Sequence, residues 1–183
     1  MYALKTERNL IWLLLLNVTM FALHMFVNYS GMLYFCQLTN ISSVYVILNF
    51  SLSVILHERK SSHKTRRFLS NLHLMTLSLE AIVFLGFWGL RIFFSKGIIH
   101  PTIERTFMVE LMSTWVHGGS LLTMFYFIKT DQIVLVSNKN EKYCFHLFWG
   151  IPYFILQFVH WFCTGEHVYG FLKYFTWVQL FVF

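Results

Sequence analysis

Two pairs of ionisable residues lie inside stretches that are otherwise apolar. Glu110 and His117 are seven residues apart in "ELMSTWVH", and His73 and Glu80 have the same spacing in "HLMTLSLE". Seven residues make almost two turns of an α-helix, so each acid shares a helix face with an imidazole. An imidazole exchanges protons near neutral pH, and a carboxylate beside it can fix its tautomer. We expect these two faces to look into the interior of a helical bundle, where such groups could take part in acid–base chemistry.

The composition indicates that these helices lie in a lipid bilayer. Of the 183 residues 57% are hydrophobic and only 12% are charged, whereas soluble domains have about a quarter charged residues. The 21 phenylalanines and 6 tryptophans suit lipid-facing walls and interfacial belts. We therefore predict an integral membrane protein, in which ionisable residues inside the spans are candidates for function because unpaired charge there is costly.

The apolar residues form six segments, of which the first five are long enough to span. A bilayer core of ~30 Å takes ~20 helical residues, and the sixth segment is shorter. The sequence predicts one domain over residues 1–183, an all-α polytopic transmembrane bundle with about six spans. The segments are 9–28, 31–56, 68–95, 104–128, 142–163 and 168–183.

The basic residues predict the orientation of the bundle. Five of the fourteen lie in the run "HERKSSHKTRR" at 57–67, between the second and third segments. The larger share of the others also falls on the side of the chain's amino terminus, which predicts that both termini are cytoplasmic. The net charge of +6 comes without a nucleic-acid-binding motif, so we expect contact with anionic lipid and no nucleic-acid partner.

A nucleophile and a base can be chosen from their estimated depths. A rise of ~1.5 Å per residue places Glu80 and His117 roughly 18 Å from the cytoplasmic face, with Thr39 near ~25 Å and Cys36 near ~30 Å. In the catalytic interpretation, Thr39 or Cys36 attacks an ester, His117 takes the proton, and Glu80 holds the imidazole tautomer.

Four further residues are candidates for substrate binding. Gln37 or Asn40 could donate a hydrogen bond to the oxyanion that forms during attack. Gly118 and Gly119 thin the helix beside His117, which permits a close neighbour or leaves room for a ligand chain.

Two other interpretations of the polar residues are open. Intramembrane His, Asn and Glu often form interhelical hydrogen bonds that only fix packing. A metal site would use His73, Glu80, Glu110 and His117, but the bundle motif of carboxylate-bridged metals has Glu and His three residues apart. The three cysteines have no paired spacing that indicates a disulfide or a zinc site. We therefore expect no metal and no cofactor.

Four motifs, in their order along the chain, carry a resemblance to a known family. They are "LYFCQLTN" at 33–40, "VFLGFWGLRIFFSKGIIHP" at 83–101, "WVHGGSLL" at 115–122 and "CTGEHVYGF" at 163–171. Together they resemble the androgen-induced and androgen-dependent family of six-helix membrane proteins, which hydrolyse fatty acid esters of hydroxy fatty acids.

The resemblance implies a threonine nucleophile in the second helix and a histidine partner in the fourth. The histidine matches His117. The nucleophile position falls on Cys36 when Tyr34 and Phe35 are aligned with the family's preceding residues, and on Thr39 when the alignment is shifted. The resemblance also implies the endoplasmic reticulum rather than the plasma membrane.

The sequence thus leads to one expected function and one alternative. We expect an integral membrane hydrolase whose partner is a membrane lipid carrying a long-chain acyl ester. The alternative is a non-catalytic scaffold or lipid-binding protein of the same fold with a degenerate site. A transporter is less favoured because the chain has no internal repeat.

Overall fold

The computed structural model describes residues 2–28, 37–57, 62–93, 106–129 and 139–169, and every regular element in these ranges is a helix. The confirmed part of the predicted fold class is therefore its all-helical character. The remaining residues, which include Cys36 and most of the segment 168–183, lie outside the described part. The elements are α1 (Tyr2–Asn28), α3 (Leu38–His57), α4 (His63–Phe93), α5 (Phe107–Thr114), η1 (Trp115–Gly119), α6 (Ser120–Lys129) and α7 (Lys139–Thr164).

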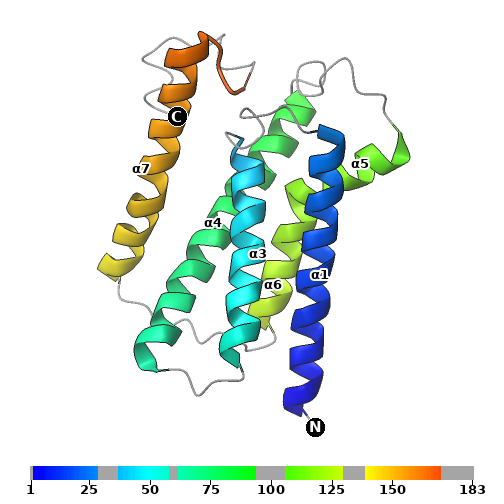
Figure 1. Ribbon diagram of the computed structural model, residues 1–183, viewed down its shortest axis with the longest axis vertical. Coiled ribbons are helices and arrows are strands. Elements are labelled where there is room, and N and C mark those ends of the chain that lie inside the picture. The colour runs from blue at the N-terminus through cyan, green and yellow to red at the C-terminus, as the bar shows by residue number, and fades with distance from the viewer. Residues whose placement is uncertain (1, 29–36, 58–61, 94–105, 130–138, 170–183) are drawn as a thin grey trace.

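The helices run up and down in a bundle (Figure 1). Helices α1, α4 and α7 ascend from the end that holds the N-terminus, whereas α3 and the run α5–η1–α6 descend toward it. Helix α3 packs between α1 and α4, and η1 contacts α1, α3 and α4. Helix α7 lies at the side of the bundle against α4. The η1 turn is thus surrounded by three long helices.

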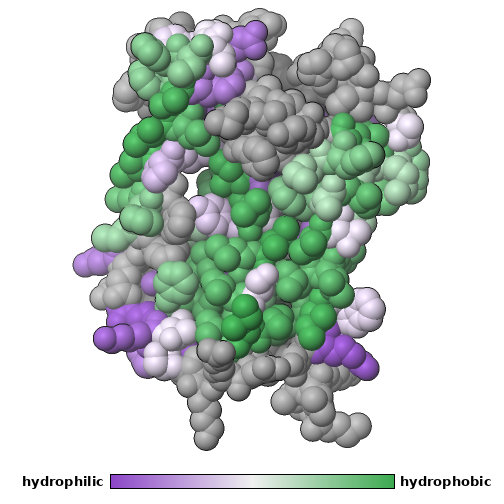
Figure 2. Space-filling view, in the orientation of Figure 1, coloured by the Kyte–Doolittle hydropathy of each residue, from purple (hydrophilic) through white to green (hydrophobic). Residues whose placement is uncertain are grey.

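In the described part of the chain, four helices are long and apolar enough to cross a membrane. They are Arg8–Val27, Leu38–Leu56, His63–Ile92 and His146–Thr164. The expected segment 104–128 is also helical, as the run Phe107–Lys129, but a π-helical turn interrupts it. Figure 2 shows apolar side chains covering much of one face of the bundle, with hydrophilic side chains near its lower edge. Such a surface suits a membrane-embedded protein, because water-facing proteins rarely expose large apolar patches.

The apolar core lies in the half of the bundle nearer the N-terminus. Phe50 of α3 and Phe127 of α6 are buried and meet edge to face, with ring centroids 5.3 Å apart. Leu10 of α1, Val46 of α3 and Met124 of α6 complete this cluster. The core therefore joins α1, α3 and α6 below the level of η1.

Polar side chains also link the helices. The amide of Asn17 in α1 donates to Thr123 in α6 over 3.3 Å. In the α3–α4 interface Asn49 donates to Thr76 over 3.5 Å and lies 3.4 Å from Nδ1 of His73. Interhelical hydrogen bonds of this kind fix the packing of membrane helices. His73 lies between Asn49 and the ring of Phe127, and these contacts give it a role in helix packing.

Gly119 is required by the packing of η1. A Cβ atom at this position would lie 2.5 Å from the indole of Trp115, one turn earlier in the same run. The indole cannot move without cost, because its Nε1 atom is buried. Gly118 is less crowded, and the nearest atoms to its Cβ position are those of Phe84 and Trp88 at 3.4 Å or more. Both glycines thus allow aromatic rings to approach the helix closely, so of the two predicted uses the structure shows the close neighbour.

We predict that Gly119→Ala destabilises the protein by about 1–3 kcal/mol, because the added methyl group overlaps the Trp115 indole. Gly150→Ala in α7 is the matched control, since no atom of the described residues lies within 4 Å of its Cβ position. That substitution should leave the stability unchanged or raise it by up to ~1 kcal/mol through helix propensity. Thermal unfolding of the purified variants in detergent measures both effects, and equal stabilities would contradict the crowding of Gly119.

Candidate functional site

His117 lies in the middle of the π-helical turn. The N–H of Ser120 donates to the carbonyl of Trp115, five residues earlier, which defines the turn. A π turn inserted in an α-helix shifts the side chains that follow it, and such turns occur frequently at functional sites. The sequence places glycines at the two positions after His117, which leaves room for the Trp115 indole to lie against the turn.

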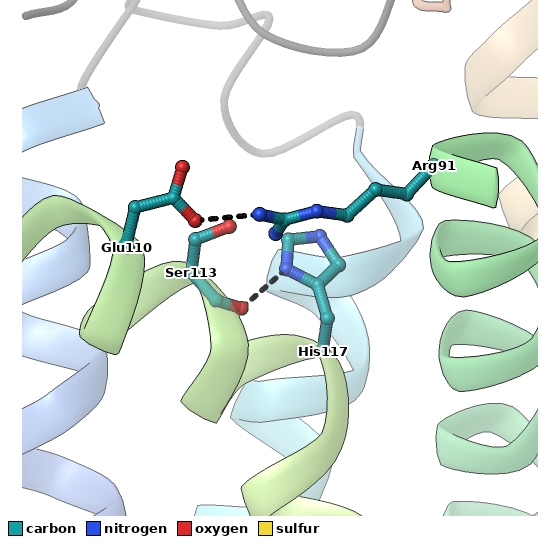
Figure 3. A network of polar contacts seen from close by, with 4 residues as sticks. All are labelled: Arg91, Glu110, Ser113 and His117. Carbon is teal, nitrogen blue, oxygen red and sulfur yellow. Dashed lines mark hydrogen bonds and ion pairs between the residues drawn. The ribbon is translucent and has the colours of Figure 1, made fainter. Parts of the chain in front are cut away.

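A hydrogen bond to the backbone fixes the orientation of the imidazole. Nδ1 of His117 lies 2.7 Å from the carbonyl oxygen of Ser113 and donates its proton to it (Figure 3). In the neutral imidazole only one nitrogen carries a proton, so Nε2 is left with a free lone pair. Nε2 has no hydrogen-bond partner within the described ranges. The ring is therefore set up to accept a proton at Nε2.

Two aromatic rings hold the imidazole in place. Phe87 of α4 stacks on it with a centroid distance of 3.7 Å and an interplanar angle of 18°. His24 of α1 meets it edge to face at 6.4 Å. Because these contacts come from two different helices, the imidazole has little freedom to turn toward the lipid. The ring faces the interior of the bundle.

An ion pair lies beside the imidazole. Nη2 of Arg91, in the last turn of α4, donates to a carboxylate oxygen of Glu110 over 2.9 Å (Figure 3). The guanidinium carbon lies over the rings of Phe87 and Trp88, at 5.8 and 5.4 Å from their centroids. Arg91 is close enough to His117 to act on it electrostatically. Both charged side chains are about one-third exposed, so the pair adds only about 0–1 kcal/mol to stability.

Glu80 joins helices at the middle of the bundle. Its side chain is fully buried and accepts a hydrogen bond from the hydroxyl of Ser120 at the start of α6. The hydroxyl of Ser42 in α3 lies beside the same carboxyl group. Glu80 therefore joins α4 to α6 by a hydrogen bond and lies next to α3, and its partner in the run α5–η1–α6 is Ser120 rather than His117.

Thr39 lies in the first turn of α3 and is 9% exposed. Its carbonyl accepts hydrogen bonds from Ser42 and Ser43 over 3.0 and 2.9 Å, and in the described part of the chain its hydroxyl makes none. Thr39 precedes Ser42 by three residues, as His117 precedes Ser120. Because α3 and α6 descend together (Figure 1), Thr39 and His117 both lie about one turn above the Glu80 junction.

The two amide candidates lie next to Thr39. The side-chain amide of Asn40, which is buried, donates to the side-chain oxygen of Gln37 over 3.1 Å. The N–H of Leu38 donates to the hydroxyl of Tyr169 over 2.7 Å, which ties the start of α3 to the segment after α7. Gln37 and Asn40 thus belong to an ordered helix start beside the candidate nucleophile.

The predicted residues fall into two groups. One holds Glu110 and His117, which both lie near Arg91, as their shared helix face predicts. The other holds Glu80, which bonds to Ser120, and His73, which bonds to Asn49. Within the described residues, no three His, Cys, Asp or Glu side chains gather as metal ligands. Cys36 lies outside that part of the chain.

Sequence reasoning missed several residues that build this environment. Arg91 is not among the predicted site residues, although an arginine inside the apolar run "FWGLRIFF" is a signal of function by its rarity. His24 lies inside an apolar span and carries the general signal of any intramembrane ionisable residue, whereas nothing in the sequence distinguishes Phe87 from other lipid-facing or buried residues. The backbone carbonyl of Ser113 cannot be found from residue types at all.

Comparison with known proteins supports the resemblance noted in the sequence. A family model described as FAR-17a/AIG1-like protein matches residues 7–183. Comparison with curated proteins and with solved structures gives no match. The match extends over almost the whole chain and includes the π turn with His117 and the start of α3 with Thr39. The chain belongs to the FAR-17a/AIG1-like family.

Proposed function

We propose that this protein is a membrane hydrolase that cleaves long-chain acyl esters, with fatty acid esters of hydroxy fatty acids as its substrate class. One observation carries the proposal. The unbonded Nε2 of His117 and the unbonded hydroxyl of Thr39 lie at one level of the bundle, because Ser120 and Ser42, one turn below them, both adjoin Glu80. A base and a hydroxyl at one level within an apolar bundle are the elements that acyl transfer needs.

The proposed reaction has two stages. The nucleophile forms a bond to the ester carbonyl carbon while its proton passes to Nε2 of His117. The tetrahedral intermediate then collapses, the ester C–O bond breaks, and the leaving alkoxide takes that proton. In the second stage water attacks the acyl-enzyme and gives its proton to His117. The free acid leaves and the nucleophile regains its proton.

Thr39 and Cys36 are the two candidate nucleophiles. The level shared with His117 favours Thr39, whereas Cys36 precedes it by three residues and lies outside the described part of the chain. A thiol in apolar surroundings also needs an adjacent base to become a thiolate. We therefore infer that Thr39 attacks, with Cys36 as the other option.

Several groups could donate to the oxyanion. Gln37 and Asn40 adjoin Thr39, and the Asn40 amide is oriented by its bond to Gln37. The indole N–H of Trp88 is buried without a hydrogen bond in the described structure, and it lies beside Gly118, next to the base. A donor that is already desolvated stabilises developing charge effectively. Glu80 acts in this scheme as a positioning residue that keeps α3 and α6 in register.

The alternative is a non-catalytic scaffold or lipid-binding protein. The polar links Asn17–Thr123 and Asn49–Thr76 favour it, since they show that this bundle also uses polar side chains purely for packing. His117 differs from them because its Nε2 atom bonds to none of the described helices. This difference makes the hydrolase the preferred proposal.

The membrane arrangement belongs to the same proposal. We infer a single domain with about six spans, both termini in the cytoplasm, and residence in the endoplasmic reticulum. The basic run at 57–67 supports this orientation, because Lys and Arg concentrate in cytoplasmic loops. The candidate site would then lie in the outer half of the bilayer, on the luminal side.

We predict that His117→Gln lowers the rate of ester cleavage by about 10²–10⁴-fold, because the general base is lost. His146→Gln is the matched control. His146 is also a helical histidine, but it contacts Ser78 in the α4–α7 interface. The measurement is hydrolysis of a long-chain acyl ester by purified protein in detergent, with thermal unfolding in parallel. Unchanged turnover in His117→Gln would rule out His117 as the general base, and a wild-type protein that cleaves no ester would support the scaffold.

The two nucleophiles can be separated by paired substitutions. If Thr39 attacks, Thr39→Ala abolishes turnover, Thr39→Ser keeps a part of it, and Cys36→Ala has little effect. If Cys36 attacks, Cys36→Ala abolishes turnover and Thr39→Ala has little effect. Turnover that survives in the double variant Thr39→Ala, Cys36→Ala would rule out both residues.

The orientation predicts which segments can be reached from the cytosol. Epitope tags at the N-terminus and within 130–138 should be accessible to antibody after the plasma membrane alone is permeabilised. A tag within 94–105 should become accessible only after all membranes are permeabilised. The reverse pattern would contradict the assignment of the basic run to the cytoplasm.

A further inference from the structure

Arg91 is a charged group that the proposed reaction does not use. It lies in the last turn of α4, where a cation is favourable beside the helix carboxyl end. Its guanidinium rests over Phe87 and Trp88, and the neighbouring Ile92 is 72% exposed. An arginine among apolar side chains at the end of a membrane helix needs an anionic partner.

Glu110 uses only a small part of this guanidinium. An arginine side chain has five N–H donors in a planar fork. In the described structure a single hydrogen bond, from Nη2 to Glu110, engages them. About one-third of the Arg91 side chain is exposed. The other edge of the fork is therefore free to bind a second anion.

The position of the guanidinium relates it to the candidate base. Phe87 lies 3.7 Å from the imidazole centroid of His117 and 5.8 Å from the guanidinium carbon. Both distances are measured to the centroid of the Phe87 ring, so the guanidinium carbon and the imidazole centroid are no further apart than the sum of the two. In Figure 3 the guanidinium extends from α4 to Glu110, above the imidazole. An anion bound by Arg91 would lie beside His117.

The surroundings select the class of anion. The walls are aromatic and apolar, which suits a ligand with a hydrocarbon chain. A guanidinium fork matches the two oxygens of a carboxylate. A dianionic phosphate is less suitable, because the Glu110 carboxylate beside the fork repels two charges more strongly than one.

We propose that Arg91 binds the free carboxylate of a long-chain acyl ligand, held against Phe87 and Trp88 beside His117. This subsite rests on the proposed function, since in a hydrolase it would select esters that carry a carboxylate over neutral esters. Glu110 positions the guanidinium from the opposite side. Arg91 is then a residue that determines substrate specificity.

The test is an equilibrium measurement that needs no turnover. Purified full-length protein is incubated with tritiated oleate or tritiated oleyl alcohol, which share a chain but differ in charge. Binding is measured by scintillation proximity at about pH 8, well above the pKa of an unperturbed carboxyl group. The wild-type protein should bind oleate about tenfold more tightly than oleyl alcohol, as a charge-assisted hydrogen bond provides.

The variants identify the residue responsible. Arg91→Gln should bring the ratio of the two affinities close to one, while its binding of oleyl alcohol shows that the protein is folded. Arg91→Lys, which keeps the charge but not the fork, should retain part of the preference. Arg66→Gln, at the opposite end of α4, is the control and should leave the ratio unchanged.

Failure of this subsite and failure of the hydrolase are distinguishable. If the protein prefers oleate, the preference depends on Arg91 and no esterase activity is found, the carboxylate subsite is supported and the proposed hydrolase function is rejected. Equal affinities in the wild-type protein, or an unchanged ratio in Arg91→Gln, would overturn the subsite even if ester cleavage were found.

Discussion

The arrangement of the candidate site depends on the hydrogen bond between the buried carboxyl group of Glu80 and the hydroxyl of Ser120. Glu80 lies on α4, accepts a hydrogen bond from Ser120 at the start of α6, and adjoins Ser42 of α3. A buried polar group in a membrane bundle costs free energy unless it is hydrogen-bonded. The hydrogen bond of Glu80 therefore stabilises this register of the helices. One turn above the junction, the same register brings Thr39 and His117 to a common level.

Above this junction the backbone, rather than another acid, orients the imidazole. The carbonyl of Ser113 accepts from Nδ1 of His117, and the π turn supplies the geometry that aims the ring at Phe87. In hydrolytic triads a carboxylate fixes the tautomer of the histidine, but a carbonyl acceptor fixes the same tautomer without a second buried charge. The arrangement suits a low-dielectric site, where an additional unpaired anion would be expensive.

The sequence predicted much of the fold because its signals are coarse and local. Apolar runs predicted the helices. The seven-residue spacing of Glu110 and His117 predicted that their side chains lie on the same side of the helix, and both do lie near Arg91. Estimated depths placed Glu80 near His117. The hydrogen-bond partner of Glu80 is Ser120, which follows His117 by three residues. This difference is within the error of about one helical turn that a depth estimate carries.

The remaining details could not be read from residue types. A π turn has no composition of its own, and Gly118 and Gly119 indicated only that something packs closely there. The backbone carbonyl of Ser113 and the stacking of Phe87 depend on tertiary geometry. The family match agrees with the resemblance carried by the four sequence motifs.

The location of a covalent adduct would identify the nucleophile and its dependence on His117. Purified protein is treated with a long-chain fluorophosphonate, digested, and analysed by mass spectrometry. We expect one adduct, on the peptide that contains Thr39 and Cys36, and its loss when His117 is replaced by Gln. An adduct on a different helix, or the same yield of adduct without the imidazole, would contradict the proposed pairing of nucleophile and base.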